Sequence, residues 1–121
     1  MEEKIKAINE LLKKGEPGNW STDHKGYSGY KPQHIIDAVN SQLLGEWNIE
    51  VLEHKTYPIG DKRHAFTKVK VTIMGVSVEG FASHPIQKDP GDAFKSAQTD
   101  AMKKCFAHFS IGNRAYHGLL K

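Results

Sequence analysis

The sequence contains a single cysteine and no long hydrophobic run, and these two absences exclude whole classes of protein. Cys105 cannot form an intramolecular disulfide or build a zinc site alone, which indicates a reducing compartment. No stretch approaches the roughly 18 to 20 apolar residues of a membrane span, and the charged N-terminus is unlike a signal peptide. We therefore expect a soluble protein without a membrane partner, located in a bacterial or phage-host cytoplasm or in a eukaryotic nucleus or organelle.

Catalytic motifs are missing as well. The chain has no G-x-x-x-x-G-K-[ST] loop, no G-x-G-x-x-G after a strand and no H-E-x-x-H. Its seven histidines show no i, i+4 pairing with nearby carboxylates of the kind that holds a catalytic zinc ion. Cys105 falls on an apolar helical stripe, where a cysteine acts as a small hydrophobic residue. These absences predict that the protein is not an enzyme and uses neither a cofactor nor a metal.

Charge is distributed unevenly along the chain. Residues 1–61 contain seven Lys/Arg and ten Asp/Glu, a net charge of −3, whereas residues 62–121 contain ten and four, a net charge of +6. This asymmetry indicates an anionic partner, with nucleic acid ahead of a membrane because no basic amphipathic helix with exposed bulky apolar residues is evident. The alternative is that the basic residues only solvate one face of the protein.

The first third of the chain predicts two short helices joined by a loop. The whole chain of 121 residues suffices for one modest core, so we expect a single domain. Apolar residues at helical spacing predict a first helix, which ends at the helix-breaking glycine and proline residues of 15–18. Residues 15–31 combine glycines with aromatic residues and predict an ordered loop. Pro32 then suits the first position of a second helix, which ends at Gly45.

From Trp47 the apolar period changes to two, which predicts strands. The first strand runs toward a break at residues 57–61, and the second, 64–74, alternates more clearly. A tight turn near Gly75 returns the chain through a third strand, so the three strands form an antiparallel meander.

A long helix follows the predicted strands. Asp92 is expected to cap this helix, which runs to about Phe109. Its apolar stripe consists of Phe94, Ala97, Ala101, Cys105 and Phe109. The predicted fold is therefore α+β: a three-stranded antiparallel meander packed by a long C-terminal helix, a β-β-β-α core, and preceded by two short helices.

Basic residues gather in the second predicted strand and the final helix. Lys62, Arg63, Lys68 and Lys70 occur in a stretch without acidic residues. Lys68 and Lys70 share one face of the strand and stand ~7 Å apart, which suits the phosphates of an extended strand. Lys103 and Lys104 diverge by ~100° on a helix, so only one can lie near the core edge. We predict that these cations converge into one trough for an unpaired polynucleotide.

Three segments together resemble the Rad-fifty-two family of recombination and single-strand annealing proteins, including its short phage and bacterial relatives: two sequence motifs and, in layout more than in letters, the strand block between them. KSAQTDAMKKCFAHF, residues 95–109, is similar to the family's A-x-T-D-[GA]-x-K-[KR]-x-x-x-x-F helix. YKPQHII, residues 30–36, leads through Asn40 to Gly45 and Trp47, like the family's Y-x-x-x-H-x-[VI] helix. The resemblance covers roughly residues 28–113.

This resemblance implies a domain organisation. A core of residues 30–113 follows an N-terminal helix and loop, 1–29, and precedes a tail, 114–121. Ala107 departs from the family pattern, because many members have an arginine there.

The resemblance also implies a function. Family members assemble into homo-oligomeric rings that bind single-stranded DNA in a basic groove, phosphates inward and bases outward, and anneal complementary strands without consuming a nucleotide. Lys103 and Lys104 match the inner-groove basic pair, and Tyr30 matches an aromatic residue beside the groove. Lys62 and Lys88 fall near the outer basic positions, where duplex DNA binds as a second DNA. Lys25 is a loose counterpart of an upstream basic residue.

Three other functions remain open from the residues themselves. A double-stranded RNA-binding domain shares the α-β-β-β-α order, although its basic cluster opens the final helix, where this chain has Asp92. A histidine-dependent metal nuclease would explain the basic half and the histidines but lacks a carboxylate cluster. A structural oligomerisation module would show no salt-sensitive DNA binding.

Overall fold

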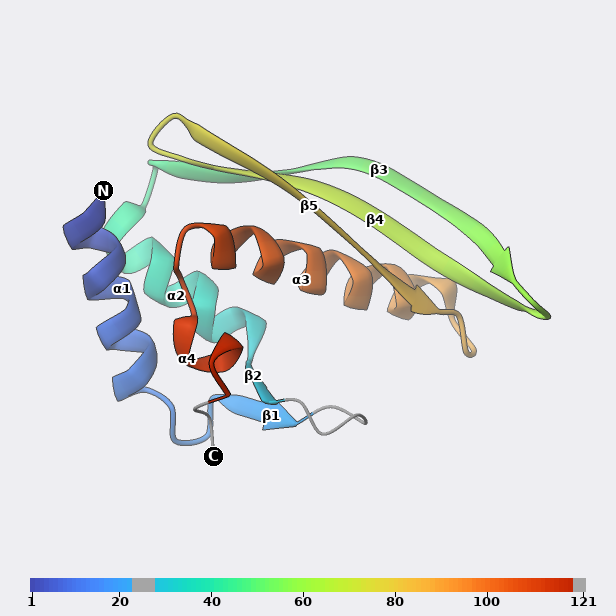
Figure 1. Cartoon of the computed structure of the whole chain (residues 1–121), viewed down its shortest axis with the longest axis horizontal. Helices are drawn as coiled ribbons and strands as arrows, with labels where there is room; N and C mark the ends of the chain where they lie inside the picture. The colour runs from blue at the N-terminus through green and yellow to red at the C-terminus, as the bar shows by residue number, and fades with distance from the viewer. Residues whose placement is uncertain (23–27, 119–121) are drawn as a thin grey trace. The chain divides into compact units, whose positions relative to one another are not determined.

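The computed structural model describes residues 1–22 and 28–118 (Figure 1), and the chain falls into two compact units. The first unit combines Met1–Glu46 with Phe106–Lys121, and the second is Trp47–Cys105.

The first unit is built from helices and one small hairpin. Helix α1 spans Glu2–Lys14, helix α2 spans Pro32–Leu43, and the short helix α4 spans Asn113–Tyr116. Pro32 opens α2 as predicted. The loop expected at 15–31 contains two strands, β1 (Trp20–Thr22) and β2 (Ser28–Tyr30), which pair antiparallel. The core side chains of this unit are Ile8, Leu12, Tyr30, Ile35, Ala38, Val39, Leu43, Phe106, Phe109 and Ile111.

The second unit contains the predicted meander. Strands β3 (Trp47–Ile59), β4 (Lys62–Ile73) and β5 (Val76–Pro85) form an antiparallel sheet in the order β3-β4-β5. The turn between β4 and β5 places both Met74 and Gly75 at positive φ, as a two-residue hairpin of the observed twist requires. The α+β prediction is therefore confirmed.

Strand β4 alternates strictly between buried and partly exposed residues. Its buried side chains are Ala65, Thr67, Val69, Val71 and Ile73. Phe66, Lys68 and Lys70 point to the opposite face, as the period of two predicted. We call this opposite face of the three strands the outer face.

A β-bulge in β3 changes which residues reach the outer face. The pairing with β4 shifts between Val51 and Glu53, so that one extra residue is inserted. Before the bulge the odd-numbered residues lie opposite buried residues of β4; after it, the even-numbered residues do. Lys55 and Tyr57 therefore lie opposite Phe66 and His64, on the outer face.

Helix α3 (Pro90–His108) covers the buried face of the sheet (Figure 1). Ala97, Ala101 and Cys105 of its predicted stripe are fully buried. The helix begins at Pro90, so the prediction that Asp92 caps it is wrong. Asp89 carries that role, because its Oδ1 accepts the Gly91 N–H at 2.9 Å, while Asp92 lies within the first turn.

Within the described residues, no helix combines the length and the apolar character that crossing a membrane requires.

Gly80 allows α3 to approach β5 closely. A Cβ atom at this position would lie 2.9 Å from Cys105 Sγ and 3.0 Å from the Ala101 carbonyl oxygen. Cys105 Sγ in turn lies 3.6 Å from the Val78 carbonyl oxygen. The absence of a side chain at residue 80 thus sets the spacing between helix and sheet.

We predict that Gly80→Ala lowers the free energy of unfolding by about 1 to 3 kcal/mol, because one added methyl group overpacks this contact. Urea unfolding measures the change. Glu79→Ala is the matched control: it changes the neighbouring residue, on the outer face, and removes only an exposed ion pair with Lys68, worth about 0 to 1 kcal/mol. Equal effects of the two substitutions would contradict this account of the packing.

Candidate nucleic-acid interface

The outer face places basic and aromatic side chains in one half and acidic side chains in the other. Toward the β3–β4 turn, its rows read Tyr57, His64, Pro85 and then Lys55, Phe66, Ser83 across the three strands. The next row is Glu53, Lys68, Phe81, followed by Glu50, Lys70, Glu79. The face therefore changes from aromatic and basic to mixed and acidic along the strands.

Lys68 and Lys70 do lie on one face, but acidic residues of the flanking strands accompany them. Lys68 Nζ forms an ion pair with Glu79 Oε1 at 3.1 Å. Lys70 lies directly between Glu50 and Glu79 in the register. No acidic residue lies near Lys68 and Lys70 along β4 itself, but the neighbouring strands place glutamates beside both. Lys70 therefore lies in the acidic half of the outer face.

Two pairs of rings lie on the outer face, Tyr57 with His64 and Phe66 with Phe81, and we call the four residues the aromatic patch. The centroids of Phe66 and Phe81 are 5.7 Å apart at an interplanar angle of 30°. Tyr57 and His64 are stacked at 5.7 Å, and the Tyr57 hydroxyl donates to Ser83 Oγ at 2.9 Å. The side chain of Phe81 is 61% exposed.

Two lysines place their ammonium groups over the phenylalanine rings. Lys55 Nζ lies 5.0 Å from the Phe66 centroid, and Lys104 Nζ lies 6.0 Å from the Phe81 centroid. Lys104 Nζ also donates to the Phe81 carbonyl oxygen at 3.1 Å, at the unpaired edge of β5. Cation–π contacts at exposed sites are worth about 0.5 to 1 kcal/mol. A cation from helix α3 and a cation from strand β3 therefore lie at the aromatic patch.

The two consecutive lysines of α3 have different surroundings. Lys104 is exposed and extends to the edge of β5. Lys103 is half-buried, and burial lowers the pKa of its ammonium group, while the Asp100 carboxylate acts in the opposite direction. Only Lys104 joins the cations of the outer face, as the divergence of neighbouring helical residues requires.

The remaining predicted basic residues lie toward the β3–β4 turn. Lys62 and Arg63 are exposed at the start of β4, and Arg63 donates to Thr56 Oγ1 at 2.5 Å. The Ile86 N–H donates to the Arg63 carbonyl oxygen at 2.9 Å, so the segment that leads to the exposed Lys88 begins at the same end of the sheet. Lys25 lies outside the described residues.

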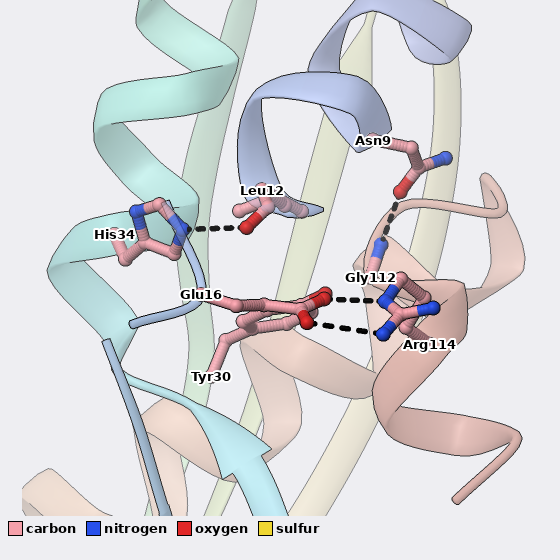
Figure 2. A network of polar contacts seen from close by, with 7 residues as sticks. All are labelled: Asn9, Leu12, Glu16, Tyr30, His34, Gly112 and Arg114. Carbon is pink, nitrogen blue, oxygen red and sulfur yellow. Dashed lines mark hydrogen bonds and ion pairs between the residues drawn. The ribbon is translucent and has the colours of Figure 1, made fainter. Parts of the chain in front are cut away.

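Tyr30 does not present its ring to a ligand, which corrects its expected place beside a groove. Its side chain is 2% exposed, and its hydroxyl donates to Glu16 Oε2 at 2.8 Å. Arg114 binds the same carboxylate through Nε and Nη2 (Figure 2). The aromatic side chain of the resemblance is a core residue here.

Further contacts tie this cluster into the first unit. Asn9 Oδ1 accepts the Gly112 N–H at 2.9 Å, and His34 Nε2 lies 3.1 Å from the Leu12 carbonyl oxygen (Figure 2). These contacts connect α1 with α2 and with the turn before α4. The carboxylate of Glu16 thus lies in a structural network rather than on a binding surface.

The network shifts the pKa values of Glu16 and Tyr30 in opposite directions. The hydrogen bond from Arg114 lowers the pKa of Glu16, although desolvation opposes it. Desolvation and the Glu16 carboxylate raise the pKa of Tyr30 above its ordinary value. The Glu16 charge contributes stability above the ordinary carboxyl pKa and loses it as the pH falls through the lowered value. The Tyr30 contribution is full below the ordinary phenol pKa and is lost as the pH rises toward the raised value.

Lys55 and the four residues of the aromatic patch were not predicted as site residues. The sequence could have predicted that Phe66 and Phe81 face outward, because the alternation of their strands places both on the face opposite the buried residues. The sequence could not have predicted the orientation of Lys55, because it depends on the bulge in β3.

His84 and Asp100 form a second polar pair in this unit. His84 Nε2 lies 2.5 Å from Asp100 Oδ2, between β5 and α3, and both groups are partly exposed. Among residues 1–22 and 28–118, no three His, Cys, Asp or Glu side chains are grouped as metal ligands. The pair therefore links strand and helix.

Comparison of the sequence with models of protein families and with curated proteins gives no match.

We predict that Glu16→Gln lowers the urea midpoint of unfolding at pH 7 and that this difference shrinks as the pH is lowered toward 3. At low pH the wild-type carboxyl group becomes protonated and loses its charged contact with Arg114, so the two proteins converge. Glu10→Gln, an exposed carboxyl on α1, serves as the control and should change little. A Glu16→Gln difference that stays constant from pH 7 to pH 3 would show that the charge has no role.

Proposed function

We propose that this chain binds single-stranded DNA on the outer face of the β3-β4-β5 sheet and anneals complementary strands without ATP, in recombination or DNA repair. The proposal combines the resemblance to the Rad-fifty-two family with the cations gathered at the aromatic patch. One observation carries it: Lys104 of α3 reaches the edge carbonyl of Phe81, opposite Lys68 in the register and beside the ring pair that Lys55 flanks.

The cations of this surface can exchange their present partners for phosphates. Lys68 is paired with Glu79 and Lys55 with Glu53, and all four side chains are substantially exposed. Such exposed pairs contribute about 0 to 1 kcal/mol. Phosphate contacts, in contrast, gain free energy from the release of condensed counterions. Among the described residues no carboxylate forms an ion pair with Lys104, so on binding a phosphate this lysine gives up only its hydrogen bond to the Phe81 carbonyl oxygen and its contact with the Phe81 ring.

Annealing follows from binding of this kind without bond-breaking chemistry. Neutralised phosphates reduce the repulsion between two strands, and a strand held in extended form presents its bases one after another. Phosphate contacts carry no sequence information, so sequence preference should be slight. Chains assembled into a ring would extend one such surface into a long track.

The end of the sheet near the β3–β4 turn is the candidate for contact with a second DNA, including a duplex. Lys62 and Arg63 are exposed there, and Lys88 lies two residues beyond Ile86, which pairs with Arg63. Lys62 and Arg63 belong to the same sheet as the aromatic patch, and Lys88 follows its last strand, which suits one DNA strand on the face and another at its end.

The proposal predicts that the protein accelerates duplex formation between complementary labelled oligonucleotides with EDTA present and ATP absent. Lys104→Ala should slow annealing and weaken single-strand binding. It should also reduce the slope of log affinity against log salt by roughly 0.7, the value for one lost phosphate contact on a single strand.

Lys95→Ala on the same helix is the matched control. Nine residues separate it from Lys104, which at ~100° per residue places the two on opposite sides of α3, and both are exposed. The proposal fails if Lys104→Ala leaves the salt slope and annealing rate at wild-type values. Cleavage that appears only when metal is restored would instead support a nuclease, and preference for double-stranded RNA would support an RNA-binding module.

A further inference from the structure

We propose that Phe81 and Phe66 form a stacking platform for nucleobases, so that single-stranded nucleic acid is held by its bases as well as by its phosphates. This inference rests on the proposed function and specifies how the outer face would contact its ligand. It adds a contact that phosphate binding alone does not require.

The first argument is the exposure of the rings. Single exposed apolar residues are common on protein surfaces, but Phe81 is 61% exposed and its ring pairs with that of Phe66 on a face that also carries the Tyr57 and His64 pair. Phe66 and Phe81 come from adjacent strands on diagonal positions of the register, 5.7 Å between centroids. Base–aromatic stacking needs such a flat, accessible π surface on a rigid support.

The second argument is the position of the cations relative to the rings. Lys55 Nζ and Lys104 Nζ lie over the Phe66 and Phe81 rings. A base that stacks on a ring replaces the ammonium group, and the long lysine side chain can then bind the phosphate of that same nucleotide. Stacking of a base is worth more than an exposed cation–π contact, so this exchange is favourable.

The third argument is the charge that surrounds the platform, which selects the ligand. Lys55, Lys68 and Lys104 border the two phenylalanines together with Glu53, whereas Glu50 and Glu79 flank Lys70 one row further along. Three lysines and one glutamate thus border the platform, whereas one lysine and two glutamates make up the next row, so phosphates are favoured beside the platform and disfavoured one row further along. An apolar protein partner would gain nothing from three lysines at the rim of its site.

Stacking also predicts selectivity for single strands and is compatible with annealing. In a duplex the faces of the bases are already stacked on one another, so they cannot reach a ring on a flat sheet. A base that stacks through one face keeps its pairing edge free for a complementary strand. The platform therefore accepts unpaired bases and leaves them able to pair.

The test compares two oligonucleotides of equal length, oligothymidine and an abasic oligonucleotide, which carries the same phosphates without bases. Wild-type protein should bind oligothymidine more tightly, by roughly five- to hundredfold for each stacked base. Phe81→Ala should remove most of this preference while it leaves the abasic affinity unchanged. Lys104→Ala should weaken binding to both oligonucleotides.

Val76→Ala is the matched control, because Val76 is an exposed apolar residue of the same strand, 49% exposed, outside the aromatic patch. Phe81→Leu keeps apolar area without an aromatic face and should behave like Phe81→Ala. Equal wild-type affinity for both oligonucleotides, or a Phe81→Ala loss that is the same on both, would overturn the platform while the proposed DNA binding stands.

Two further outcomes are decisive. If wild-type protein binds neither oligonucleotide, the proposed function itself fails. If Phe81→Ala dissociates an oligomer in sedimentation experiments but retains the preference for oligothymidine, Phe81 contacts a second copy of the chain, and the platform is excluded.

Discussion

The close packing of α3 against β5 at Gly80 is the constraint on which the candidate site depends. Because residue 80 has no side chain, Ala101 and Cys105 can lie against the strand, and Lys104, one residue before Cys105, then reaches the edge carbonyl of Phe81. Alternation along β5 turns Phe81 outward when Gly80 and Ala82 face the helix. The same packing thus buries one face of the sheet and places a cation beside an exposed ring on the other.

The β-bulge in β3 is the second constraint, since it changes which side chains share the outer face. Without the extra residue, Lys55 and Tyr57 would point to the face of the sheet that α3 covers instead of to the outer face. With it, both reach the outer face beside Phe66 and His64. The bulge therefore completes the aromatic patch and supplies its second cation, so a local irregularity of one strand determines the composition of the surface.

Most of the fold could be predicted from the sequence, whereas the site could be predicted only in part. The meander and its helix could be predicted from local signals: the alternation in β4, the turn at Gly75 and the apolar stripe of α3. The acids beside Lys68 and Lys70 come from β3 and β5, so they are invisible to a reading of β4 alone. Tyr30 was placed by resemblance, but burial against Glu16 depends on tertiary contacts with Arg114. The orientation of Lys55 depends on the bulge in β3, which no pattern in the sequence predicted.

The two units divide the roles that the sequence suggested for the chain as a whole. In the first, the Glu16, Tyr30 and Arg114 cluster is structural; in the second, the outer face carries the accessible cations and rings. Photocross-linking of oligonucleotides that contain 5-iodouracil, with the sites mapped by mass spectrometry, tests this division most directly. We predict cross-links to Phe81 and Phe66, at the surface bordered by Lys104. Cross-links confined to residues of the first unit would contradict the account.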